Sequence, residues 1–209
     1  MLVITGTQRS GTTAAASLFK AEGYDLGSDL WDEVGGLENE TICAFYREYL
    51  GDDRFPFTNF PALQGIRLSG PLSFALFEQV SLPVVKFSML CMNPAFVTIW
   101  SKFRPPSKGD EFLVMNRSKM LVVKSKRASW DIFQQDSILL NQDAHTMSHN
   151  FATSVGLLTD YGYPVSVMPF EDLMNNFSIT YYLAEMGCHL RIREKTWEKV
   201  IDPGKVHFQ

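Results

Sequence analysis

The chain has 209 residues, of which 45% are hydrophobic and 20% charged, and its formal net charge is −4. This length suits one domain with a substantial core, and the composition excludes a disordered chain. The acidic balance excludes a globally basic nucleic-acid binder, although a few Arg and Lys side chains can still converge on a local anion. We therefore expect one domain over residues 1–209 that binds no nucleic acid.

Strands and helices alternate along the sequence. The first strand, Leu2–Thr5, ends at Gly6, and a helix follows over Thr12–Glu22. Further strands are predicted at 83–89, 111–116 and 164–168, and further helices at 38–50, 94–103, 120–128, 137–161 and 171–187. This alternation predicts an α/β fold of three layers, with a mostly parallel central sheet of about 4–5 strands flanked by helices.

Apolar runs, the first residues of the chain and the cysteines indicate the cellular compartment that we expect. No apolar run approaches the ~20 residues that span a bilayer, and the first residues enter a strand without the basic segment of a signal peptide. The three Cys residues, Cys43, Cys91 and Cys188, form no CxxC pair and are typical of reduced, mostly buried thiols. We expect a cytoplasmic protein with no membrane partner and no zinc site.

The strongest motif is Gly6-Thr-Gln-Arg-Ser-Gly-Thr-Thr13, between the first strand and the first helix. Its glycines have the G-x4-G spacing of a phosphate-binding P-loop, in which backbone N–H groups and a helix N-terminus hold an anion. Thr12 stands where an NTPase carries a lysine against the terminal phosphates, and the cation of the loop is Arg9 instead. The loop therefore suits a donor that ends in a singly charged sulfate, with Arg9 neutralising charge on the bridging leaving oxygen.

The run Gln8-Arg-Ser-Gly-Thr-Thr13 resembles the 5′-phosphosulfate loop of sulfotransferases that use 3′-phosphoadenosine 5′-phosphosulfate (PAPS). That family also has an Arg at the end of a later strand and a Ser eight residues on, which grip the 3′-phosphate. Arg117 and Ser125 match this pair, although Ser118 and Lys119 depart from the family's Arg-Asp-Pro or Arg-His-Pro. The resemblance runs from Gly6 to about Leu173, with low identity between motifs.

The resemblance implies a compact bacterial-type member with a P-loop fold and PAPS as the donor. The product would be adenosine 3′,5′-bisphosphate (PAP), and no metal would be required. The residues implied in cofactor binding are Gly6, Gln8, Arg9, Ser10, Gly11, Thr12, Thr13, Arg117 and Ser125. A weaker similarity covers Pro169-Phe-Glu-Asp-Leu173, an element whose acids are expected to cap a helix and to carry no chemistry.

Sulfuryl transfer to a hydroxyl needs a general base. Glu38 is the candidate, because it resembles the acid after the first helix in compact bacterial-type members; Glu40 is a rival, and Glu38 could instead be a charge at a helix N-terminus. Lys86 ends a strand and faces either the sulfuryl group and acceptor or solvent. His145 and His149, four residues apart, are interpreted as a polar helix face and not as metal ligands.

We therefore expect sulfuryl transfer from PAPS to a hydroxyl or amine of a small-molecule or carbohydrate acceptor, with Arg9, Glu38 and Lys86 as catalytic residues. Residues 51–70, rich in Pro, Asp, Asn and Gly, are interpreted as an acceptor loop or lid. Two alternatives stay open. One is a P-loop kinase of small molecules, and the other is a catalytically inactive homologue that binds a nucleotide or a partner.

Overall fold

The computed structural model describes residues 1–7, 10–27, 37–39, 41–43, 45–46, 77–118, 121–122 and 144–201. Several residues to which the sequence assigns a role lie outside this part of the chain: Gln8, Arg9, Glu40, the 51–70 loop and Ser125.

Four strands, all parallel, form the sheet of the described residues. They are β1 (Leu2–Gly6), β2 (Val84–Lys86), β3 (Glu111–Asn116) and β4 (Val165–Pro169). The strand order is β2-β1-β3-β4, so β1 is paired with β2 on one side and with β3 on the other. The strands are mostly apolar because helices cover both faces. The α/β class and the parallel sheet predicted from the sequence are confirmed.

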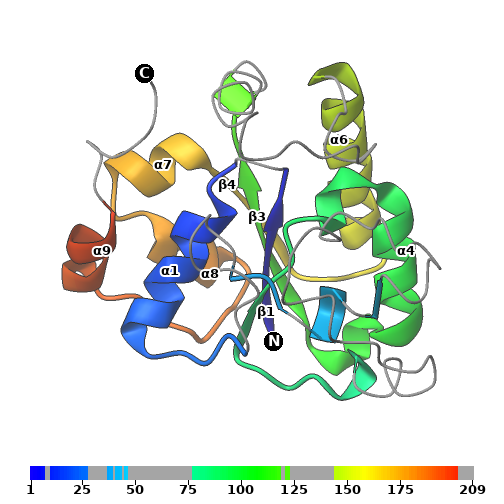
Figure 1. The fold of residues 1–209 in the computed structure, drawn as a ribbon, viewed down its shortest axis with the longest axis horizontal. Helices are drawn as coiled ribbons and strands as arrows, with labels where there is room; N and C mark the ends of the chain where they lie inside the picture. Colours follow the sequence, from blue (N-terminus) through cyan, green and yellow to red (C-terminus); the bar gives the residue numbers. More distant parts are fainter. Residues whose placement is uncertain are drawn as a thin grey trace, which may run out of the picture.

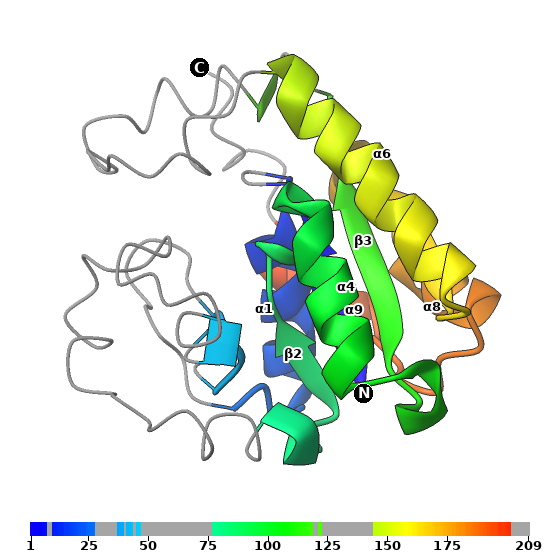
Figure 2. The ribbon, with the colours of Figure 1, turned by 90° about the vertical axis from the view of Figure 1, so that its right-hand side faces the viewer.

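Helices cover the sheet in two layers (Figures 1 and 2). One face carries α1 (Thr12–Glu22), α7 (Phe170–Asn175), α8 (Ile179–Glu185) and α9 (Glu194–Val200); the other carries α4 (Pro94–Phe103) and α6 (Ala144–Asp160). We call these the α1 face and the α6 face. The chain runs from β1 to β2 and then back past β1 to β3. Since crossovers between parallel strands are right-handed, this reversal puts α1 and α4 on opposite faces.

Local signals explain why several elements have the predicted bounds. Gly23 ends α1 in the left-handed conformation, with φ 94°. Asn93 begins α4: its side chain accepts a hydrogen bond of 3.0 Å from the Ala95 amide, and Pro94 occupies the first helical position. Other elements differ from the prediction. β2 ends at Lys86 instead of continuing to residue 89, and α9 was not predicted at all.

The amino-terminal edge of the sheet is held by a buried ionic cluster. Asp110, directly before β3, accepts two hydrogen bonds from Arg104, at 2.7 Å from Nε and 2.8 Å from Nη2. The indole of Trp100 donates a third, at 3.1 Å, and the hydroxyl of Tyr163 donates to the Arg104 carbonyl at 2.5 Å. Because the polar groups of this cluster partner one another, we interpret it as structural; it lies at the edge opposite the strand ends described below.

The buried thiols give a prediction about reactivity and pH. All three Cys side chains are buried, and loss of solvation raises the pKa of Cys91 from 9.0 to about 12 and that of Cys188 to about 12. In the folded protein at pH 8 we expect a disulfide reagent such as DTNB to label the three thiols only as fast as the chain opens, whereas in denaturant it should label them at once.

The raised pKa values also predict how stability depends on pH. Above pH 9 the unfolded chain releases thiol protons that the folded chain retains, so the free energy of unfolding should fall between pH 9 and about 12. Urea unfolding at pH 8 and pH 10 measures this; equal stabilities, or rapid native labelling, would contradict it.

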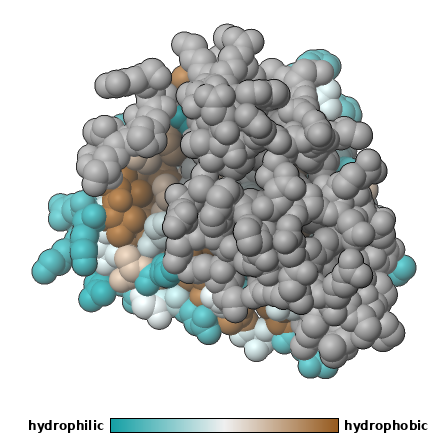
Figure 3. Space-filling model, in the orientation of Figure 1, coloured by the Kyte–Doolittle hydropathy of each residue, from teal (hydrophilic) through white to brown (hydrophobic). Residues whose placement is uncertain are grey.

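No helix in the described part of the chain is long and apolar enough to cross a bilayer. On the face drawn in Figure 3, the largest hydrophobic area lies on the left, over the side where α1 and α7 lie in Figure 1, with hydrophilic residues beside it, and smaller hydrophobic areas lie along the lower edge.

Candidate functional site

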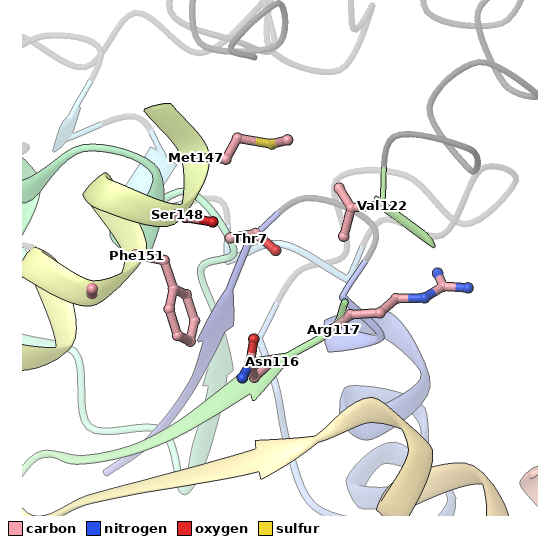
Figure 4. A pocket seen from close by; sticks show the side chains of 8 residues that line it. Thr7, Asn116, Arg117, Val122, Met147, Ser148 and Phe151 are labelled. Atoms are coloured by element: carbon pink, nitrogen blue, oxygen red, sulfur yellow. The ribbon is translucent and has the colours of Figure 1, made fainter. Parts of the chain in front are cut away.

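The carboxyl ends of β1 and β3 lie side by side where the strand order reverses. In open parallel sheets such a switch point is the place where ligands bind. Thr7 directly follows β1, and Arg117 directly follows β3. Both residues line a pocket of about 310 Å³, which α6 closes on its other side (Figure 4). The fold therefore brings the two strongest sequence motifs to one edge.

Both glycines of the G-x4-G motif are required by their surroundings. A β-carbon at Gly6 would overlap the carbonyl oxygen of Met115 and the hydroxyl of Ser10. Gly11 has φ 94°, which glycine alone adopts readily, and a β-carbon there would overlap the ring of Phe170. The turn between β1 and α1 is thus shaped by the close approach of its backbone to Met115, Ser10 and Phe170.

Ser10 fixes the shape of this turn. Its hydroxyl donates a hydrogen bond of 2.6 Å to the carbonyl of Thr7, and its amide donates to the same oxygen at 3.2 Å. Thr12 and Thr13 begin α1 directly after Gly11, with no side chain capping the helix. The unbonded amides of a first helical turn favour anions. The described residues of the predicted loop, Gly6 and 10–13, are therefore together.

Arg117 lies beside the same turn, although its position in the sequence is distant. Its guanidinium carbon is 4.4 Å from the centroid of the Phe170 ring, the ring that abuts Gly11. Only 9% of the Arg117 residue is exposed. Phe170 therefore links the two motifs, a role that was not predicted from the sequence. One feature indicates why Phe170 has this role. It directly follows β4, whose last residue, Pro169, pairs with Asn116, the residue before Arg117.

Because successive side chains of a strand point to opposite faces of the sheet, the residues at the strand ends are divided between the α1 face and the α6 face. In β3, Leu113 and Met115 pack on the α1 face, whereas Phe112 and Val114 pack on the α6 face. Continuing the alternation, Asn116 falls on the α6 face and Arg117 on the α1 face. Figure 4 shows this directly: the Arg117 guanidinium turns away from the pocket, and the Asn116 amide points toward Thr7.

Glu38 and Lys86 meet in a buried ion pair at the end of β2. The Lys86 ammonium is 2.8 Å from Glu38 Oε1, and both residues are 3% exposed. Ser88 donates twice to the same carboxylate, through its amide to Oε2 at 3.0 Å and through its hydroxyl to Oε1. These three donors fix the position of the carboxylate. Ser88 is a member of this cluster that was not predicted.

The sequence left open whether Glu38 is a charge at a helix N-terminus and whether Lys86 extends into solvent. The helical residues after Glu38 are capped by Asn39, whose side chain accepts from the Ile42 amide at 3.0 Å. Glu38 therefore directs its carboxylate to Lys86 and Ser88, and Lys86 pairs with Glu38 instead of extending into solvent.

The two histidines of α6, His145 and His149, are exposed. In the described part of the chain, no three His, Cys, Asp or Glu side chains gather in a way that could hold a metal ion.

No protein-family model matches the sequence, and a search among curated proteins gave no match. The function of the site is therefore argued from its own geometry and chemistry.

Proposed function

We propose that the chain is a sulfotransferase, which moves a sulfuryl group from PAPS to a hydroxyl or amine of an acceptor. One observation carries the proposal: the guanidinium of Arg117 stacks on the ring that contacts Gly11. A glycine turn made for an anion and a second cationic residue are thereby adjacent. A nucleotide with anionic groups at both its 5′ and 3′ positions has the charges that such a pair of sites would bind.

The residues present fit this donor. The turn from Gly6 to Thr13 would hold the 5′-phosphosulfate, and Arg117, together with Ser125, would hold the 3′-phosphate. Bound PAPS supplies a sulfuryl group activated by its anhydride bond to phosphate. Arg9 would neutralise charge on the leaving oxygen, Lys86 would face the transferred group, and Glu38, held by Lys86 and Ser88, would accept the proton of the acceptor.

A transfer assay distinguishes this proposal from its alternatives. The full chain would be incubated with a panel of alcohols, phenols, amines and sugars, once with ³⁵S-labelled PAPS and once with γ-³²P-ATP and Mg²⁺. We expect labelled sulfate on an acceptor and no labelled phosphate, because Thr12 replaces the lysine of an NTPase loop. Phosphate transfer would support the kinase alternative, and PAP binding without any transfer would support the inactive homologue.

Replacing Arg117 by Ala should weaken PAP binding by about 1.5–3 kcal/mol, or about 10- to 150-fold, because a hydrogen-bonded cation on the 3′-phosphate is lost. The matched control is Arg193→Ala, which removes an Arg whose side chain is 75% exposed and pairs with Glu22 away from the strand ends. Its PAP affinity should equal that of the wild type. Calorimetry measures both, and an unchanged affinity for the Arg117 variant would show that the 3′-phosphate assignment is wrong.

A further inference from the structure

The pocket at the switch point has a chemical character different from that of the glycine turn. We call it the β3–α6 pocket; it is lined by Thr7, Asn116, Arg117, Val122, Met147, Ser148, Phe151 and Ala152. Met147 and Phe151 give α6 an apolar wall, and Figure 4 shows the Phe151 ring beside the Asn116 amide. Thr7, Asn116 and Ser148 supply neutral hydrogen-bonding groups. Among these described lining residues none is acidic, and the guanidinium of Arg117 points away from the pocket, toward Phe170.

The two faces of the sheet divide the charge at the strand ends. Gly6, Lys86 and Arg117 alternate with residues of the α6 face, and so belong to the α1 face, where α1 also begins. The charge of Lys86 is balanced by Glu38, so the Arg117 guanidinium and the positive N-terminus of α1 are the groups that would draw an anionic donor to the α1 face. The β3–α6 pocket lies across the ends of β1 and β3 from these two groups. It shares Thr7 with the start of the glycine turn, so a molecule in it would lie next to the donor.

We propose that the β3–α6 pocket binds the acceptor, and that the acceptor is a compact, neutral alcohol with an apolar ring. This inference rests on the proposed sulfotransferase function. The volume of about 310 Å³ is at the small end of the range for ligand pockets and suits one or two rings. A ring packs well against the Phe151 ring and the Met147 thioether. The Asn116 amide offers one donor group and one acceptor atom to the hydroxyl.

The reaction then balances as follows. The hydroxyl oxygen of the acceptor forms a bond to the sulfur of PAPS, while the bond from that sulfur to the bridging oxygen breaks. The bridging oxygen leaves on PAP with the electron pair. The hydroxyl proton leaves the pocket for the proposed base, Glu38, which is not among the described lining residues. The acceptor becomes a sulfate ester. A sugar or a second anion would place several polar or charged groups against Met147 and Phe151, which offer them no hydrogen bond.

Binding of three probes to the full chain saturated with PAP tests the proposal without requiring turnover. The probes are 2-naphthol, its anionic analogue 6-hydroxy-2-naphthoate, and methyl β-glucoside. We expect 2-naphthol to bind at least about tenfold more tightly than either of the others, since each replaces apolar contact by buried charge or polarity.

Two variants locate the bound probe. Ala152→Trp fills the β3–α6 pocket from an exposed position of α6, and Phe151→Ala removes its aromatic wall. Each should weaken 2-naphthol binding by about tenfold or more and leave PAP affinity unchanged. His149→Ala, also exposed on α6 but outside the lining, is the matched control and should alter neither.

The outcomes separate this inference from the function on which it rests. If the wild type does not bind PAP, the sulfotransferase proposal fails. If PAP binds but 2-naphthol does not, or binds no better than the glucoside or the naphthoate, the acceptor class is wrong. If 2-naphthol binds and Ala152→Trp leaves its affinity unchanged, the acceptor occupies another place, and the assignment of the β3–α6 pocket is overturned.

Discussion

Replacing Gly11 by Ala should lower the free energy of unfolding by about 2–5 kcal/mol, whereas the same change at Gly23 should cost only about 1–2 kcal/mol. The two glycines flank α1 with nearly identical backbones, φ 94° and ψ 11° at Gly11 and φ 94° and ψ 12° at Gly23. Ala is therefore equally strained at both. Only at Gly11 would the new β-carbon overlap another side chain, the ring of Phe170; at Gly23 it would meet nothing. The difference between the two variants thus isolates the packing of Phe170 on the turn.

The two glycine variants should also differ in binding. Gly11→Ala must displace Phe170, the ring under Arg117, and should weaken PAP binding, while Gly23→Ala should leave it unchanged. Phe170→Ala alone should also be destabilising, because Phe170 is buried, but the double variant Gly11→Ala/Phe170→Ala should lose less than the sum of the two single losses, since the overlap is absent from it. Urea unfolding and calorimetry on Gly11→Ala, Gly23→Ala, Phe170→Ala and the double variant measure this. Equal losses at Gly11 and Gly23 would mean that the turn does not pack as described.

The second large effect is expected at the Glu38–Lys86 pair. Lys86→Ala should cost about 3–5 kcal/mol of unfolding free energy, because it leaves the carboxylate of Glu38 buried without its cation. Arg193→Ala removes the cation of a second ion pair, with Glu22, but the Arg193 side chain is 75% exposed. The Glu22 side chain is itself only 7% exposed, but it keeps the backbone amide of residue 193, which donates to it at 2.7 Å, and water replaces the exposed cation, so this control should lose at most about 1 kcal/mol.

Unfolding in urea, followed by the fluorescence of the four Trp residues, compares the two variants. Similar small losses in both would show that the Glu38–Lys86 pair is open to water. The result also bears on activity assays: with a large loss of stability, the transfer rate of a Lys86 variant has to be corrected for its folded fraction before it reports on catalysis.

The sequence was most informative where local signals act alone. β1, α1, α4 and β3 lie within one residue of the predicted bounds, since Gly23 and the Asn93-Pro94 pair set helix ends through their own backbone preferences. The apolar run 83–89 was less informative. Phe87 and Met89 are as buried as the residues of β2, yet they lie outside the strand, in the turn that leads into the short 3₁₀ helix Leu90–Met92. Burial alone does not distinguish these structures.

Only the local part of the candidate site could be predicted from the sequence. A glycine turn between a strand and a helix is a local motif, so the residues of the turn could be named from the sequence. Phe170 and Ser88 could not, because their roles depend on contacts with Gly11, Arg117 and Glu38, which lie far away in the sequence. Which face of the sheet carries the charged residues could not be predicted from the sequence either, since this depends on the order of the strands in the sheet. α9 was missed because its seven residues are too few for a clear period.

Calorimetric titration of the full chain with PAP, ADP and ATP tests the central claim most directly. Binding of PAP about tenfold or more tighter than either of the others is predicted, because only PAP carries the 3′-phosphate assigned to Arg117. Equal or tighter binding of ADP or ATP would contradict the claim that the glycine turn and Arg117 together select a 3′-phosphorylated nucleotide.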